Sequence, residues 1–106
     1  MRRGRKRRGT QGRIPRPVFI EDYPIFSKFT PSPKTGKESV KLEHAELEVL
    51  RLVDMEDMSQ EEAGISMGIS RGTIWRLLHR ARRKVALALI EGRPLEILSS
   101  EKTDKD

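Results

Sequence analysis

The sequence predicts a mainly α-helical fold, with a three-helix core carrying a helix-turn-helix and a short β pairing beside it. Apolar residues recur at helical spacing in residues 43–54 and again after Ser70. Serines stand where helix-capping residues belong, at Ser59 and Ser70. Five of the six prolines fall between residues 14 and 33, which keeps that part of the chain from forming a long helix. With 106 residues, the chain has room for one domain.

The N-terminal residues are expected to form a basic arm. Residues 1–17 contain eight Arg or Lys and no acid, whereas the rest of the chain, with 14 bases and 16 acids, is close to neutral. Residues 1–13 combine Arg with Gly and lack hydrophobic periodicity, so we expect them to be disordered in the free protein. The arm cations proposed to bind a polyanion are Arg2, Arg3, Arg5, Lys6, Arg7 and Arg8. The alternative is a tail that only aids solubility.

The folded domain is expected to span residues 14–98, followed by a disordered tail at 99–106. Its proline-rich start, residues 14–33, should wrap over the helical core and include a short strand at residues 17–20. A second short strand is expected at residues 95–98, after Gly92 and Pro94. The side chains expected to anchor the wrapping segment are Phe19, Tyr23, Ile25, Phe26 and Phe29.

The first helix should run from Glu43 to Asp54. Leu47, Leu50 and Val53 give it one buried stripe, and its acids Glu43, Glu46 and Glu48 are expected to form a solvated face. The second helix is expected at residues 60–67, because Ser59-x-x-Glu62 is a capping box and Gly68 ends the helix.

The third helix should begin after the Ser70 cap and end at Gly92. In a projection at 100° per residue, its apolar residues fall within about 60° of one direction. Arg76, His79 and Arg83 point nearly the opposite way. Near the end of the helix, Leu87 and Ile90 leave the apolar face, so we expect the N-terminal segment or a second copy of the chain to cover them, which gives a homodimer in the second case. The apolar face is formed by Ile74, Leu77, Leu78, Ala81, Val85 and Leu89.

Residues 59–78 have the features of a helix-turn-helix. Ala63 and Gly64 are small where two helices must approach, and Gly68 allows the tight turn between them. Ile69 fills the angle between the helices, and Ser70 caps the helix that would enter the major groove.

Two resemblances follow from these motifs. The stretch from Ser59 to Val85, with its "SQEEAG", "GISRGTI" and "ARRKV" runs, resembles the helix-turn-helix of region 4 of sigma-70 factors. Nearly the whole chain is similar to the UPF0251 (DUF134) family of small prokaryotic proteins, through the basic start, "LEHAELEVLRLVD", "MSQEEA", "MGISR", "ARRKVA" and "EGRPLEI". These two resemblances together imply DNA binding and transcription regulation. Gly72 and Trp75 depart from the family, whose members often have Gln and a small residue after the Ser-Arg pair.

Arg71 and Arg76 are the strongest candidates for DNA contact, because Arg binds guanine through two hydrogen bonds. Trp75 could stack on a sugar or a thymine methyl, or pack on the first helix. Arg80, Arg82, Arg83 and Lys84 could reach flanking phosphates or pair with acids of the first helix, and Gln60 could bind a phosphate or be solvated. The full set of candidate DNA-binding residues is Gln60, Ser70, Arg71, Gly72, Thr73, Trp75, Arg76, His79, Arg80 and Arg83.

Several classes of protein are disfavoured. The chain has no Cys, which excludes disulfides and thiol chemistry, and the two His residues are not spaced as metal ligands. No apolar run is long enough to span a membrane, so a cytoplasmic protein is expected. No catalytic constellation, cofactor motif or metal site is recognised. Two alternatives to a DNA-binding regulator remain open: an RNA-binding or ribosome-associated basic protein, and a sigma-like module that binds polymerase.

Overall fold

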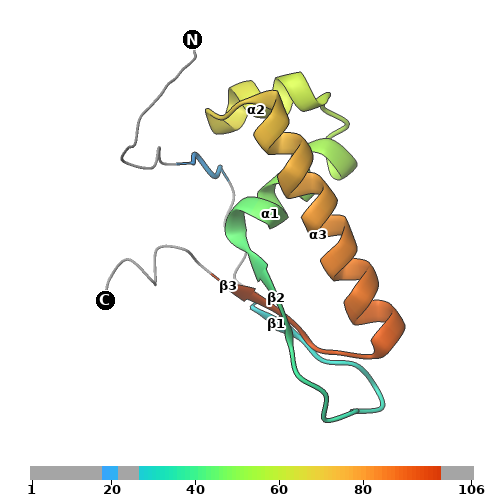
Figure 1. Ribbon diagram of the computed structural model, residues 1–106. Coiled ribbons are helices and arrows are strands. Elements are labelled where there is room, and N and C mark those ends of the chain that lie inside the picture. The colour runs from blue at the N-terminus through green and yellow to red at the C-terminus, as the bar shows by residue number, and fades with distance from the viewer. Residues whose placement is uncertain (1–17, 22–26, 99–106) are drawn as a thin grey trace, which may run out of the picture.

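The computed structural model describes residues 18–21 and 27–98, which form a helical bundle at one end and a small sheet at the other (Figure 1). The expectation of a mainly helical fold is confirmed, with three helices and a three-stranded sheet. The elements in chain order are β1 (Lys28–Phe29), β2 (Val40–Glu43), α1 (His44–Val49), the π-helical η1 (Leu50–Met55), α2 (Gln60–Met67), α3 (Arg71–Glu91) and β3 (Leu95–Leu98).

The helices begin and end close to where local chemistry predicts. Helix α1 and η1 together cover the predicted first helix, and the backbone N–H of Glu43 donates to Glu46 Oε1 at 3.0 Å. In α2, the Glu62 N–H donates to Ser59 Oγ at 3.0 Å, and Gly68 ends the helix at a φ of 71°. Helices that start at a side-chain cap and end at a left-handed glycine have their terminal backbone groups satisfied locally, which explains why these boundaries are readable from sequence.

The sheet has the strand order β1-β3-β2. β3 runs antiparallel to β1 and parallel to β2, with Leu95 opposite both Phe29 and Val40. The strand predicted at residues 95–98 is therefore confirmed. The strand predicted at residues 17–20 is wrong: Val18–Ile20 form no strand, and Pro17 lies outside the described residues. The Phe19 N–H instead donates to the Met67 carbonyl at 3.1 Å, which holds this stretch against the end of α2.

The core lies between α3 and the elements packed against it. Leu52, Met67 and Ile74 are fully buried at its centre, and Val40 and Leu42 of β2 are buried beneath α3. On α3 itself the buried residues are Ile74, Leu77, Leu78, Ala81 and Ala88.

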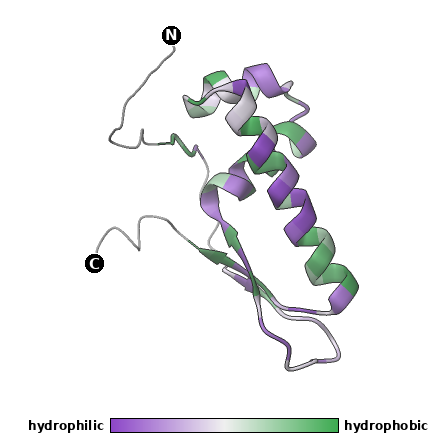
Figure 2. Ribbon diagram, in the orientation of Figure 1, coloured by the Kyte–Doolittle hydropathy of each residue, from purple (hydrophilic) through white to green (hydrophobic). Residues whose placement is uncertain are grey.

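The prediction that Leu89 belongs to this buried face is wrong, because Leu89 is 77% exposed and Ala88 is buried instead. Ala88 follows Ala81 by seven residues and so returns to within about 20° of its direction, whereas Leu89 is about 80° away. Figure 2 shows the result as apolar colour around the last turns of α3. Ile90 is 84% exposed and Leu87 is partly buried, so the described residues leave part of this helix end uncovered.

Two of the five side chains expected to anchor the N-terminal segment, Phe19 and Phe29, lie within the described residues. Phe19 and Phe29 are both exposed, so neither is an anchor; Phe19 attaches through its backbone, and Phe29 lies in a two-residue edge strand. Val18 packs against the core in their place. Tyr23, Ile25 and Phe26 lie outside the described residues. No helix in the described ranges is long and apolar enough to cross a membrane.

Candidate nucleic-acid interface

The angle between α2 and α3 is fixed by close contact at Gly64. A Cβ atom at this position would lie 2.8 Å from the backbone oxygen of Ile69, so a larger residue would force the two helices apart. The Ile69 N–H donates to the Gly64 carbonyl at 3.0 Å, and Ala63 beside it is fully buried. These contacts set the direction in which α3 leaves the turn and therefore which of its residues face outward.

The first turn of α3 is organised by two hydroxyl groups. Ser70 Oγ accepts from the Thr73 N–H at 3.1 Å and lies 3.0 Å from Thr73 Oγ1. Arg76 Nη2 in turn donates to Thr73 Oγ1 at 3.3 Å. Ser70 and Thr73 are thus occupied in capping the helix and in positioning the Arg76 guanidinium at its outer face.

Five predicted contact residues lie together on the exposed side of the first three turns of α3. The Trp75 and His79 rings stack in parallel, with centroids 5.0 Å apart and planes 6° from each other. The indole is 53% exposed and is absent from the side chains packed against the core, so its contact is with its own helix. The five residues are Arg71, Gly72, Trp75, Arg76 and His79.

A second group of cations on α3 is paired with carboxylates of α1 and η1. Arg80 Nε and Lys84 Nζ donate to the two oxygens of Glu46, at 3.2 and 2.8 Å. Arg82 forms a two-point pair with Asp54, with distances of 3.2 and 2.6 Å. Arg80, one of the predicted DNA contacts, is therefore engaged within the protein, as is Lys84, whereas exposed Arg83 has no ion pair within the part of the chain that the structure describes.

The Glu46 carboxylate is 1% exposed, which contradicts the prediction that the acids of the first helix form a solvated face. Burial raises the pKa of Glu46, but the hydrogen bonds from Lys84, the Glu43 backbone and Arg80 lower it more, so its pKa is below the ordinary value. Glu46 is thus a buried anion that two cations of α3 share.

Glu48 is buried in the same way, on the side of α1 that faces the N-terminal segment. It accepts from Arg51 at 3.0 and 2.9 Å and from the Glu21 N–H at 3.1 Å. Arg51 also contacts the Glu21 side chain at 2.9 Å, and these hydrogen bonds raise the pKa of its guanidinium. The helix 43–54 is therefore covered on two sides. Glu46 is compensated by distant cations of α3, whereas Glu48 is compensated by Arg51 of its own helical segment and by the Glu21 N–H.

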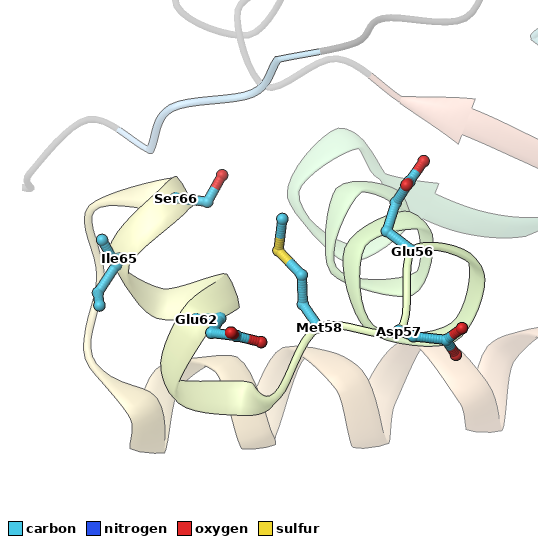
Figure 3. A pocket seen from close by; sticks show the side chains of 6 residues that line it. All are labelled: Glu56, Asp57, Met58, Glu62, Ile65 and Ser66. Carbon is cyan, nitrogen blue, oxygen red and sulfur yellow. The ribbon is translucent and has the colours of Figure 1, made fainter.

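The surface between η1 and α2 is acidic, opposite in charge to the exposed face of α3. A groove of about 600 Å³ opens there, with Met58 at its centre and acids on either side (Figure 3). Residues 52–70 contain five acids and no base, so a polyanion should avoid this groove. Its lining residues are Glu56, Asp57, Met58, Glu62, Ile65 and Ser66.

Gln60 and the basic arm are also predicted to contact DNA, and neither belongs to the group of exposed residues on α3. Gln60 is partly buried in the first turn of α2, with no base close to it in sequence. The basic arm and the tail at 99–106 lie outside the described residues. No group of three potential metal ligands occurs within residues 18–21 and 27–98.

Comparison with known proteins identifies the family. The UPF0251 protein of Archaeoglobus fulgidus is 45% identical over 87 residues, which cover 82% of this chain and 83% of the relative. The UPF0251 protein of Pyrococcus furiosus is 50% identical over 91 residues, covering 83% and 84%. That of Pyrococcus horikoshii is 53% identical over 73 residues, covering 69% and 66%. No solved structure matches the chain.

The family described as "Protein of unknown function DUF134" matches residues 1–104, which include the arm, the helices and the last strand. The resemblance to the UPF0251 (DUF134) family, inferred from the sequence motifs, is therefore confirmed. The chain belongs to the UPF0251 (DUF134) family.

Proposed function

We propose that this protein binds double-stranded DNA as a transcription regulator, with α2 and α3 acting as a helix-turn-helix like that of sigma region 4. The observation that carries the proposal is the exposed face of α3. Arg71, Arg76 and Arg83 form no ion pair within the described residues, although carboxylates lie on the neighbouring helices. Exposed cations left unpaired along one helix favour a polyanionic partner.

The geometry supports insertion of the first turns of α3 into the major groove. The groove admits one α-helix, and side chains near the N-terminus of such a helix reach the base edges. With 21 residues, α3 is about 32 Å long, so its later turns must leave the groove. Arg71 and Arg76 in the first two turns are unpaired, and Arg80, Arg82 and Lys84 farther along are paired internally, which agrees with this limit; unpaired Arg83 is the exception.

The arm supplies affinity that does not depend on sequence. The seven Arg or Lys residues of residues 1–13, with no acid among them, are suited to neutralising phosphates along the duplex or within the minor groove. Base reading by α3 and phosphate neutralisation by the arm would together give a site-specific but salt-sensitive complex.

The exposed end of α3 leads us to propose that a second copy of the chain covers Leu89 and Ile90. Proteins of this design often read paired half-sites, and this patch lies on the same helix as the reading face. Sedimentation at micromolar concentration should show a dimer for the natural chain and a monomer for Ile90→Glu. A natural chain that remains monomeric contradicts the proposal.

Selection of binding sites from a random DNA duplex library tests the function. We expect enrichment of a defined sequence, and the same protein should bind that duplex more tightly than double-stranded or single-stranded RNA at each of several salt concentrations. Tighter binding of RNA, or no enriched duplex, would contradict the proposal. Trp75 is the only tryptophan of the chain, so its emission gives a direct signal for the titrations.

A further inference from the structure

Trp75 presents a flat apolar surface on the face of α3 that carries the unpaired cations. Side chains four residues apart on a helix are neighbours, and the imidazole of His79 lies parallel to the indole at a centroid distance of 5.0 Å. This contact restricts the indole while leaving 53% of Trp75 exposed. An aromatic ring that is already held in place loses little conformational entropy when a ligand contacts it.

Gly72 leaves the helix backbone open three residues before the indole. A Cβ atom at Gly72 would meet nothing closer than Arg76 Nη1 and Ser70 Oγ, each at 3.9 Å, so packing does not exclude a larger residue. Gly64, in contrast, is required because a Cβ there would lie 2.8 Å from a backbone oxygen. Glycine weakens a helix relative to alanine, and at Gly72 the fold gains no contact in return. The opening instead allows a ligand to approach the helix closely.

The surroundings of the indole limit what it can recognise in the proposed complex. In the major groove the C5-methyl group of thymine is the apolar feature of the base edges, whereas guanine and adenine present hydrogen-bonding groups. Arg71 and Arg76 on the same face can serve those hydrogen-bonding groups or the phosphates, and the stacked ring face between them is suited to an apolar group.

We propose that Trp75, held by His79 and exposed beside Gly72, is a specificity-determining residue that contacts the C5-methyl group of a thymine in the target site. This inference rests on the proposed duplex binding through α3. It names the chemical feature that is read, a methylated pyrimidine edge, and assigns His79 the role of positioning the indole.

The test uses the full chain and the duplex obtained by selection. Each thymine is replaced in turn by deoxyuridine, which removes only the C5-methyl group. We expect one thymine of a site, or one in each half-site, at which the replacement weakens binding roughly fourfold, the effect of one buried methyl-sized group. Trp75→Ala should bind the thymine and uracil duplexes equally at that position. Trp75→Phe, which keeps an apolar ring, should retain part of the discrimination.

Arg71→Ala is the matched control, because it changes the same face without removing the ring; it should weaken binding yet keep the preference for thymine over uracil. The inference is overturned if no thymine is sensitive to the replacement, or if Trp75→Ala remains as sensitive as the natural chain. If the proposed function itself is wrong, the result is different, because no duplex sequence is then enriched in the selection. Thermal unfolding of each variant confirms that the helices are intact.

Discussion

Helix α3 carries two groups of cations that are nearly alike in composition and different in surroundings. Arg80, Arg82 and Lys84 are each paired with a carboxylate of α1 or η1. Arg71, Arg76 and Arg83 are exposed and form no ion pair among the residues that the structure describes. Arg71 and Arg82 are eleven residues apart and so lie within about 20° of each other around the helix. Only Arg82 is paired, so the carboxylate within reach along the helix, and not the residue type, decides whether a cation is paired.

This difference separates cations that stabilise the fold from cations that are available for the proposed binding. The paired group replaces water around buried or half-buried acids, and losing it leaves an anion without compensation. The unpaired group contributes little to folding, since exposed charges are well solvated. A count of bases between residues 70 and 91 therefore overstates by a factor of about two what is available to a polyanion.

The largest expected effect is on stability, from Glu46→Gln. The change removes the anion shared by Arg80 and Lys84, and we expect the free energy of unfolding to fall by about 2 kcal/mol, below the usual range for a broken buried pair because both cations are partly exposed. Urea unfolding followed by circular dichroism measures the change.

Glu61→Gln is the control for Glu46→Gln, because Glu61 is an exposed acid of α2, and we expect its effect to be within about 0.5 kcal/mol. Equal stabilities for the two variants would show that the pairing of Glu46 does not hold α3 to α1.

The next effect is on affinity, from deletion of residues 2–13. The deletion removes all seven bases of the arm and leaves both cation groups of α3 in place. We expect affinity for duplex DNA to fall on the order of tenfold at low salt, with a shallower dependence of log K on log salt concentration, because fewer counterions are released. An unchanged slope would contradict a phosphate-binding role for the arm, and an unchanged unfolding midpoint serves as the control.

A smaller effect is expected on the pH dependence of stability. The pKa of Glu46 is lowered on folding, and that of Asp54 is lowered by its hydrogen bonds from Arg82. A lowered pKa means that the ionised acid stabilises the fold above its unfolded pKa, and that this stabilisation is lost as the pH falls through the folded pKa. The natural chain should therefore lose stability below about pH 4.5, and Glu46→Gln should lose less over the same range. Parallel curves for the two proteins would contradict the assignment to Glu46.

Local rules predict one part of this fold well. The bounds of α2 and the start of α3 follow from Ser59, Glu62, Gly68 and Ser70, because capping involves residues within one turn of each other. The exposed face of α3 follows equally from helical periodicity. The candidate contact residues on that face could therefore be placed from sequence alone.

Two other features of the fold depend on pairing between residues far apart in the sequence. Strand β2 has the pattern of two buried and two charged residues, and it is a strand because β3 pairs with it more than fifty residues later. Glu46 has the residue type of a solvated position and is buried only because Arg80 and Lys84 reach it from α3. The sequence offers pairing of Arg80 and Lys84 with acids of the first helix as one alternative, but it identifies neither which acid is buried nor β3 as the partner of β2.

The most direct test of the account compares Arg71→Ala with Arg82→Ala on the selected duplex. Both changes remove one arginine from α3, so they alter the net charge of the chain equally. We expect Arg71→Ala to weaken binding by about 1–3 kcal/mol and to relax sequence preference, and Arg82→Ala to change affinity less than about twofold. Equal losses for the two variants, or a larger loss for Arg82→Ala, would contradict the division of α3 into a DNA-binding group and a structural group of cations.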